Sequence, residues 1–405
     1  MKQISYIDNI KLYNIRGFKE LELNLYTNNE SRKRTFILGK NGTCKTTLLR
    51  CIAIGLCDPE DGNSLIAEPI GNLIAENSNY AEIKITLRSK NCNNNPYEIF
   101  TKIIKKDSKE IVDFETSTTT TTEKFFVCGY GAGRSFESPE KFRGYRIIDS
   151  VYTLFSYEQG LTPAETILRR LKDYLGDKIY EYTLKGIKKA LSLSEEDEIN
   201  LPKGGGVMIS GPSIGKEIPL EGWADGYKIS FNWILDLYGR AMQAKRVTKK
   251  GGIKGILLVD ELEQHIHPSI QAGILPRLSG ILPEMQIFAT THSPSVILGA
   301  SHEELVVLKR DKGNVFSIEK IPDFTLYSAE DILKDKNIFD SEVYSLETND
   351  QLKKYYALAA KSKRTKEEQK ELNLLAKDIQ KKQLPLVEES PLLKEIKSFQ
   401  KKYDL

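Results

Sequence analysis

"ILGKNGTCKTTLLR", residues 37–50, is the stretch that decides the fold of this chain. It follows the apolar run "RTFIL" and leads into a segment in which apolar residues recur at helical spacing, which predicts strand, loop and helix. This is the arrangement of a phosphate-binding loop (P-loop) of the form G-x-x-x-x-G-K-[ST]. One letter departs from the pattern, because Cys44 stands where glycine is expected.

Cys44 adds a side chain at a tightly curved position of the loop. If the backbone there needs a positive φ, a residue other than glycine costs on the order of 1 kcal/mol or more. A cost of about 1.4 kcal/mol weakens affinity roughly tenfold, which cellular ATP tolerates. A thiol at a helix N-terminus is in principle oxidisable, but a tolerated substitution is the simpler interpretation. We therefore predict that the loop still binds nucleotide.

Each part of such a loop has a role toward the phosphates. Backbone N–H groups and the helix N-terminus surround them, Lys45 neutralises charge at the β and γ positions, and the Thr46 hydroxyl ligates Mg²⁺. ATP and Mg²⁺ are therefore the predicted cofactors. A glycine turn entering a helix is the alternative for the loop taken alone. The predicted nucleotide-binding residues are Gly39, Lys40, Asn41, Gly42, Thr43, Cys44, Lys45, Thr46 and Thr47.

A second motif, "GILLVDELEQHIHP" (residues 255–268), is a hydrophobic strand that ends in two carboxylates. Such an ending suits Mg²⁺-phosphate chemistry, because Asp260 can hold the metal while Glu261 orients or deprotonates the attacking water. A core strand ending in an acidic turn is the alternative for this motif alone. Its position after the P-loop favours the catalytic interpretation.

A third motif, "FATTHSPSVI" (residues 288–297), is another buried strand, and it delivers Thr290, Thr291, His292 and Ser293 to a sheet edge. Ligand groups of an open α/β sheet gather at the carboxyl ends of its strands, where all three motifs would meet. We therefore predict that His292 lies beside the γ-phosphate, with a purely structural histidine as the alternative.

These motifs, with "IKLYNIRGFKELELNL" (residues 10–25), resemble the ABC-type ATPases of the group that includes the OLD nucleases, RecF and the SMC heads. The nearer likeness is to stand-alone ATPases of bacterial antiphage defence, such as PtuA of the Septu system. The resemblance covers roughly residues 1–340. It implies heads that dimerise, with each ATP held between one subunit's P-loop and the other's signature motif.

"EGWADGYK" (residues 221–228) resembles that signature. Ala224 lacks the hydroxyl that the resemblance leads one to expect toward the γ-phosphate, whereas the Gly226 N–H and the helix N-terminus could still bind the anion. Hydrolysis would be slowed more than binding. The residues expected to act across the dimer are Trp223, Ala224, Asp225, Gly226 and Tyr227.

Two arginines are further candidates. Arg16 lies in "IKLYNIRGFKELELNL" (residues 10–25), and Arg134 ends "VCGYGAGR", which resembles a glycine-rich stretch of these ATPases. Arg134 would then lie near the nucleotide or the dimer seam, although a simple strand and turn explains the stretch equally well.

The implied fold class is α/β, an ABC-ATPase head that combines a P-loop sheet and helices with an antiparallel β subdomain, a helical insertion and C-terminal helices. We expect an N-terminal lobe over residues 1–146 and a helical insertion with a glycine-rich connector over 147–215. A C-terminal lobe over 216–327 carries the signature and the second and third motifs. A charged helical region over 328–405 is a possible docking surface, with a solvated helical face as the favoured alternative.

Composition limits the function classes. The chain has 405 residues, a net charge of +3 and five cysteines, and it shows no apolar run of membrane-spanning length and no signal peptide. We expect a cytoplasmic protein without a membrane, disulfides or zinc. The charge alone does not imply nucleic acid, so any contact with it would be indirect.

We expect no nuclease centre in this chain, because too little sequence follows "ELVVLKR" for a Toprim domain and no HNH-type histidine pair stands outside the motifs. We therefore expect an ATPase that acts as sensor and scaffold of a defence system and controls a separate HNH or Toprim nuclease. It would form a homodimer, and larger assemblies are compatible with the sequence. A RecF-like DNA-binding repair ATPase and a scaffold that binds ATP with little turnover are the alternatives.

Overall fold

A computed structural model describes the chain over most of its length. The described residues are 5–89, 96–118, 125–134, 145–157, 160–202, 204–212, 214–266, 268–318, 321, 323–324, 327–361 and 363–381. The chain forms two compact units, Met1–Ile332 with Asn337–Phe339, and Leu333–Lys336 with Asp340–Leu405.

A six-stranded sheet forms the centre of the first unit, in the order β16-β15-β5-β14-β13-β9. All its neighbouring pairs except β15 with β16 are parallel, so the carboxyl ends of five strands lie along one edge. The inner strands β5 and β13 are apolar and almost wholly buried, as expected for parallel strands covered on both faces. The strands are β5 (Arg34–Leu38), β9 (Val127–Tyr130), β13 (Lys254–Val259), β14 (Glu284–Thr290), β15 (Leu305–Asp311) and β16 (Asn314–Ser317).

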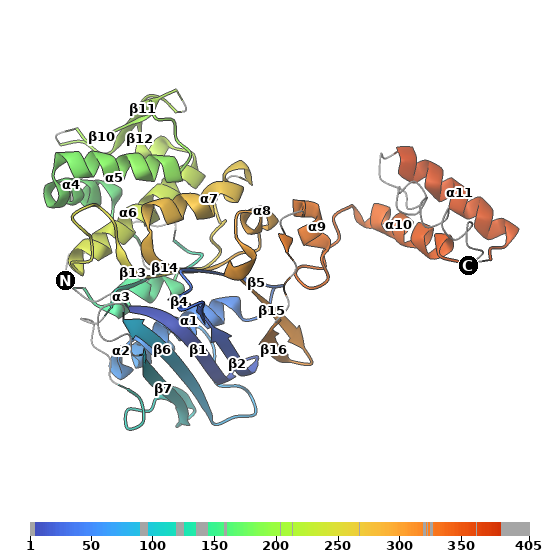
Figure 1. The fold of residues 1–405 in the computed structure, drawn as a ribbon, viewed down its shortest axis with the longest axis horizontal. Helices are drawn as coiled ribbons and strands as arrows, with labels where there is room; N and C mark the ends of the chain where they lie inside the picture. The colour runs from blue at the N-terminus through green and yellow to red at the C-terminus, as the bar shows by residue number, and fades with distance from the viewer. Residues whose placement is uncertain are drawn as a thin grey trace. The chain divides into compact units, whose positions relative to one another are not determined.

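An antiparallel sheet in the order β2-β1-β6-β7-β8 packs on one side of this sheet (Figure 1). Helix α1 (Lys45–Leu56) lies between them, contacting β6 and β7 on one side and β9 and β14 on the other. It is buried along almost its whole length, as a helix that is apolar all round must be. The strands are β1 (Ser5–Ile15), β2 (Phe18–Asn24), β6 (Tyr80–Ser89), β7 (Pro96–Lys106) and β8 (Lys109–Val112), with a small hairpin of β3 (Tyr26–Thr27) and β4 (Glu30–Ser31) and helix α2 (Pro59–Ile66) beside them.

Helices α4 to α7 lie on the other side of the parallel sheet (Figure 1). They and the short elements around them are α3 (Ile147–Val151), η1 (Tyr152–Leu154), α4 (Ala164–Leu175), α5 (Asp177–Ala190), η2 (Leu220–Gly222), α6 (Asp225–Gln243), α7 (Pro268–Ile281), α8 (Pro294–Ile297) and η3 (His302–Glu304). The α/β fold class, with a P-loop sheet, an antiparallel β subdomain, a helical insertion and C-terminal helices, is confirmed.

One expectation for this region was incomplete. The stretch predicted to be only a glycine-rich connector, residues 203–215, contains strand β11 (Met208–Gly211) and the first residue of β12 (Gly215–Pro219), which form a three-stranded antiparallel sheet with β10 (Glu198–Asn200). The glycines are compatible with strands here because Gly211 and Gly215 have φ of 153° and 122° beside the turn that joins β11 to β12.

The second unit holds α10 (Leu346–Ala359) and α11 (Lys366–Lys381), which pack together around Leu352, Tyr355, Leu372 and Ile379. The short helix α9 (Ala329–Lys334) precedes them. The predicted helical character is therefore present, whereas residues 382–405 of this region lie outside the described residues. The four-part division of the chain stays a prediction.

Candidate nucleotide-binding site

A cavity of about 370 Å³ opens at the carboxyl edge of the parallel sheet, and residues of all three motifs line it. The P-loop follows β5, Asp260 follows β13 and His292 follows β14, so adjacent parallel strands bring the motifs together. The lining residues are Arg16, Asn41, Gly42, Cys44, Lys45, Thr46, Thr47, Asp260, Glu261, Thr290, His292 and Arg310.

Lys45 is the buried cation of the cavity. Its Nζ donates to the carbonyl oxygens of Gly39 at 2.8 Å and Lys40 at 3.1 Å, which ties it to the P-loop. Burial lowers the pKa of the Lys45 ammonium to about 8, although the negative charges of Asp260 and Glu261 pull it upward. The Lys45 ammonium is therefore fixed beside the P-loop and poorly hydrated, so a bound phosphate would interact with it strongly.

Asp260 and Thr46 form the candidate magnesium site. The Thr46 hydroxyl donates to Asp260 Oδ2 at 2.8 Å, and the Thr290 hydroxyl donates to Oδ1 at 2.6 Å. One hydroxyl and one carboxylate are the oxygen ligands that Mg²⁺ takes from a protein when phosphates and water supply the rest. Among the described residues no group of three or more His, Cys, Asp or Glu side chains could hold a metal by itself.

Arg134 supports the backbone of Asp260 and Glu261, whereas the sequence left its position open between the nucleotide, the dimer seam and a simple turn. Arg134 is buried beneath the carboxylates, and its guanidinium donates to the carbonyls of Asp260 at 2.7 Å and Glu261 at 2.8 Å. Glu261 itself has a φ of 49°, so these bonds hold a strained backbone. Burial lowers the pKa of Arg134 to about 10. Arg134 therefore holds the backbone that carries the two carboxylates, and it is not among the residues that line the cavity.

The carboxylate of Glu261 is partly withdrawn from water. Burial first, then the charges of Asp260 and Glu263, raise the pKa of Glu261 above its ordinary value. The Glu261 N–H donates to the Thr290 hydroxyl at 2.8 Å, which fixes the start of the turn. A carboxylate with a raised pKa is a better proton acceptor, as a general base requires.

His292 lies in the cavity opposite the P-loop lysine. Its backbone N–H donates to Glu263 Oε1 at 2.5 Å, and its ring lies 6.4 Å from the ring of Phe339, centroid to centroid. Burial, followed by the nearby Lys45 charge, lowers the pKa of His292, so the imidazole is neutral at pH 7. A neutral imidazole can donate one hydrogen bond to a phosphate oxygen.

The remaining P-loop residues build the loop. Cys44 has a φ of 62° and a ψ of 26°, and no side-chain hydrogen bond caps the helix there. Gly39 has a φ of 146°, and a Cβ there would lie 2.5 Å from the Leu308 carbonyl oxygen. The Thr43 hydroxyl donates to the Lys40 carbonyl at 2.8 Å. Lys40 itself is exposed.

Arg16 lines the cavity, but its donors are engaged. The guanidinium donates to the Thr47 hydroxyl at 3.0 Å and the Asn72 carbonyl at 2.9 Å, and it also bonds the carbonyls of Ile70 and Gly71. Arg16 therefore clamps the loop before β6 onto the start of α1.

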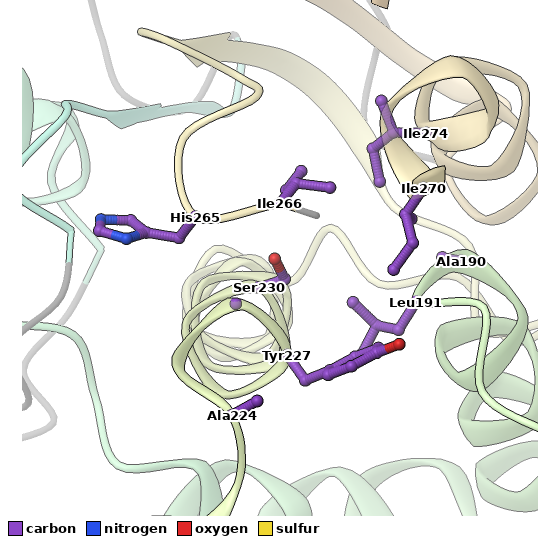
Figure 2. A pocket seen from close by; sticks show the side chains of 10 residues that line it. Ala190, Leu191, Ala224, Tyr227, Ser230, His265, Ile266, Ile270 and Ile274 are labelled. Carbon is purple, nitrogen blue, oxygen red and sulfur yellow. The ribbon is translucent and has the colours of Figure 1, made fainter. Parts of the chain in front are cut away.

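The signature candidates do not reach the P-loop cavity of the same chain. They lie at the start of α6 beside a second cavity of about 500 Å³ (Figure 2). Gly226 packs against residue 265, because a Cβ there would lie 2.2 Å from the His265 carbonyl oxygen. Trp223 is buried against Phe231, and Asp225 pairs with Lys228. The residues that line this second cavity are Ala190, Leu191, Ala224, Gly226, Tyr227, Ser230, His265, Ile266, Ile270 and Ile274.

The sequence did not nominate Glu263 and Arg310, which the structure places at the P-loop site, and it placed Thr290 only at the same sheet edge as His292. Thr290 and Glu263 hold Asp260 and His292, and Arg310 lines the cavity from β15. Arg310 obeys the rule that located His292, because β15 is parallel to β5 and ends at the same edge, but the sequence does not show that these two strands are neighbours. Glu263 lies inside the second motif, but its position in the motif does not predict that it accepts a hydrogen bond from the backbone N–H of His292.

Two family descriptions match the chain. "AAA domain" matches residues 9–201, which include the P-loop. "AAA domain, putative AbiEii toxin, Type IV TA system" matches residues 158–298, which include the signature candidates, Asp260, Glu261 and His292. In the part of the chain that the structure describes, no helix is both long and apolar enough to span a membrane.

Individual proteins are also similar. The chain is 24% identical over 383 residues to the "Septu protein PtuA" of Bacillus mycoides (strain KBAB4), covering 91% of this chain and 50% of that protein. It is 42% identical over 55 residues to the "Retron Ec83 probable ATPase" of Escherichia coli, covering 14% of this chain and 10% of that protein. The chain thus spans half the length of the first relative. The SMC head domain from Thermotoga maritima is similar at 14% identity, with a TM-score of 0.45, 80% of this chain and 100% of that chain covered.

Proposed function

We propose, starting from the homology of this chain to the Septu protein PtuA and to retron ATPases, that it binds and hydrolyses ATP with Mg²⁺. The observation that carries the proposal is the meeting of the P-loop, the Asp260–Glu261 pair and His292 around one cavity. Phosphate binding, metal binding and water activation each have a candidate group there, in the arrangement that phosphoryl transfer needs.

The roles follow from the geometry. The P-loop backbone and Lys45 bind the phosphates, and Thr46 and Asp260 hold Mg²⁺, which when bound neutralises charge on the phosphates. Glu261 orients the attacking water and accepts its proton, since its pKa is raised by burial. Neutral His292 donates a hydrogen bond toward the γ-phosphate.

We infer that the complete site needs two copies of the chain. Ala224, Gly226 and Tyr227 of the signature stretch line a second cavity, and none of the signature candidates lines the P-loop cavity of the same chain. A second copy would present the N-terminus of its α6, through Gly226, to the nucleotide. Ala224 forms no side-chain cap there, which supports slow turnover relative to binding.

The biological role that we propose is antiphage defence, in which the ATPase acts as sensor and scaffold and controls a separate nuclease of the HNH or Toprim type. The homology to PtuA and to retron ATPases supports this role. Co-expression with the partner nuclease, followed by nuclease assays with ATP and without it, tests it. Nuclease activity that is the same with and without ATP, and with and without this chain, would contradict the role.

ATP binding and turnover test the enzymatic proposal directly. Lys45→Ala should abolish ATP binding, and Glu261→Gln should retain binding while turnover falls by about a hundredfold or more, because only the proton acceptor is lost. Glu20→Gln, an exposed change on β2, is the matched control and should behave as the native chain. Unchanged ATP affinity in Lys45→Ala would refute the P-loop assignment, and full turnover in Glu261→Gln would refute its role as base.

A further inference from the structure

Arg310 reaches the P-loop from a hairpin that follows the third motif. It lies near the end of β15, which runs parallel to β5, and so it points out at the edge where the phosphate loop begins. The returning strand β16 is fixed to the turn between β1 and β2, because the Val315 N–H donates to the Gly17 carbonyl at 2.6 Å. The hairpin is therefore held against the P-loop.

The turn at Gly17 leaves just enough space for this arrangement. A Cβ at Gly17 would lie 2.7 Å from Val315 Cγ2, 3.0 Å from Arg310 Nη2 and 3.4 Å from Cys44 Sγ. The hairpin, the arginine and the unusual P-loop residue thus all lie within 3.4 Å of one point, and a side chain there would displace Val315. Arg310 and Cys44 are therefore close neighbours at the turn of Gly17.

The two arginines that line the cavity differ in what they bind. Arg16 uses its donors on Thr47 and on three carbonyl groups. Among the described residues, the Arg310 side chain makes one hydrogen bond, from Nη2 to Cys44 Sγ at 3.5 Å, and it is exposed. A thiol is a weak acceptor, so most of the donor capacity of this cavity-lining side chain is not used by the protein.

The negative charge of a bound nucleotide would exceed the positive charge that Lys45 supplies, so a second cation could contact the phosphates. A nucleoside triphosphate brings about four negative charges, and Lys45 is the buried cation of the P-loop. Arginine is suited to the task because its planar group binds phosphate oxygens in pairs. We propose that Arg310 is a nucleotide-binding residue, which contacts the phosphate chain of the nucleotide while Cys44 holds its guanidinium in place. This inference rests on the proposed function.

The experiment compares ATP and AMP affinities, measured by competition against a fluorescent ATP analogue. Arg310→Gln should weaken ATP binding by about tenfold or more, the value of a hydrogen bond to a charged group. It should weaken AMP binding about threefold or less, because the contact is to the outer phosphates. Arg310→Lys should lie between native and Arg310→Gln. Lys312→Asn removes one charge from the same hairpin, away from the cavity, and should leave ATP affinity unchanged.

Two outcomes overturn the inference. One is an ATP affinity of Arg310→Gln within twofold of the native value. The other is an equal loss for ATP and AMP together with a lower melting temperature of the nucleotide-free variant, which would make Arg310 a structural residue. The proposed function fails separately, when the native chain binds no ATP or Lys45→Ala binds it as well as native. If the native chain binds ATP, Lys45→Ala abolishes that binding and Arg310→Gln retains it, the proposed function stands and only the role of Arg310 is wrong.

Discussion

Cys44 shows at the residue scale what the phosphate loop requires of its chain. Its φ of 62° is in the left-handed region, which glycine adopts freely and other residues adopt at a cost of about 1 kcal/mol. The loop therefore keeps the backbone angle without the glycine. The side chain also packs against the core of the first unit and accepts a hydrogen bond from Arg310.

Lys45 carries a prediction on pH. Only its protonated form attracts phosphate, and burial lowers the pKa of this lysine to about 8. Because the free protein loses the proton as pH rises through that value, ATP affinity should be constant below about pH 7.5 and fall roughly tenfold by pH 9. Titration calorimetry across this range measures it. An affinity that is flat to pH 9.5 would show that the lysine keeps an ordinary pKa.

The sequence was sufficient to place the residues whose position is set by local pattern, and their roles stay predictions. Thr46, Asp260 and His292 follow directly from their motifs, because a strand end fixes where its next residues lie. Arg134 and Arg310 could not be placed in this way. Their positions depend on which strands become neighbours in the sheet, and one sequence does not show that order.

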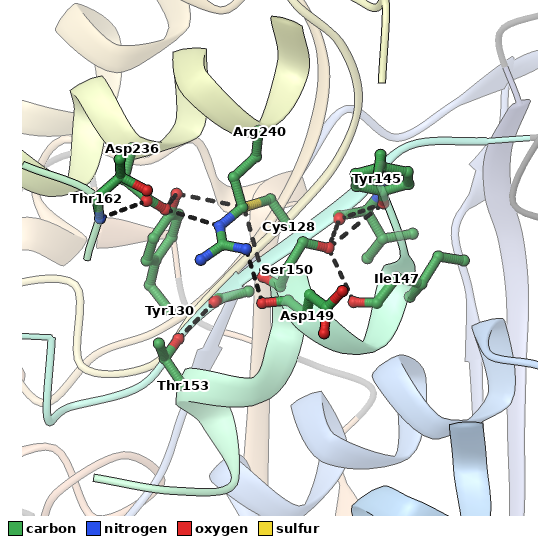
Figure 3. Close-up of polar contacts among 12 residues, drawn as sticks. Cys128, Tyr130, Tyr145, Ile147, Asp149, Ser150, Thr153, Thr162, Asp236 and Arg240 are labelled. Carbon is green, nitrogen blue, oxygen red and sulfur yellow. Dashed lines mark hydrogen bonds and ion pairs between the residues drawn. The ribbon is translucent and has the colours of Figure 1, made fainter. Parts of the chain in front are cut away.

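At the scale of elements, a buried polar network joins the helix that carries the signature to strand β9. Asp236 of α6 accepts hydrogen bonds from the Tyr130 hydroxyl at 2.9 Å, Arg240 Nε at 3.0 Å and the Thr162 N–H at 2.9 Å (Figure 3). Arg240 also donates to the Asp149 carbonyl. Since β9 leads to the turn that supports Asp260, the network links α6 to the base of the site.

Asp236→Ala should destabilise the first unit strongly. Arg240 is 3% exposed, and the change removes the carboxylate with which it pairs, which costs about 3–5 kcal/mol in buried pairs. Tyr130→Phe is the matched control, because it deletes only the hydroxyl that donates to Asp236 and accepts from the Cys128 thiol, and it should cost about 1 kcal/mol. Urea denaturation measures both. A loss below 1 kcal/mol for Asp236→Ala would mean that the pair contributes little.

The elements themselves were mostly predictable from periodicity. Helix α1 and strands β5, β13 and β14 lie where the apolar patterns placed them. The small sheet of β10 to β12 was not predicted because its strands are short and two of them contain glycine, so no sustained alternation of apolar and polar residues marks them.

At the scale of the whole molecule, the separation of the signature stretch from its own P-loop leads to a prediction of assembly. Glu261→Gln should form a stable dimer with Mg-ATP and remain a monomer without it, because ATP can bridge two copies but cannot be hydrolysed. Light scattering after size-exclusion chromatography measures the mass. The double variant Lys45→Ala with Glu261→Gln should stay monomeric. A Glu261→Gln chain that is monomeric with saturating Mg-ATP would contradict the sandwiched dimer.

The position of α1 between the two sheets has a consequence for the life of the protein in a cell. The helix on which both sheets rest begins at the phosphate loop, so a nucleotide bound there stabilises the folded first unit by mass action. At a concentration one hundred times the dissociation constant the gain is about 2.7 kcal/mol. A fall in cellular ATP would then leave more of the chain unfolded and open to proteases, so its abundance would follow the energy supply of its host.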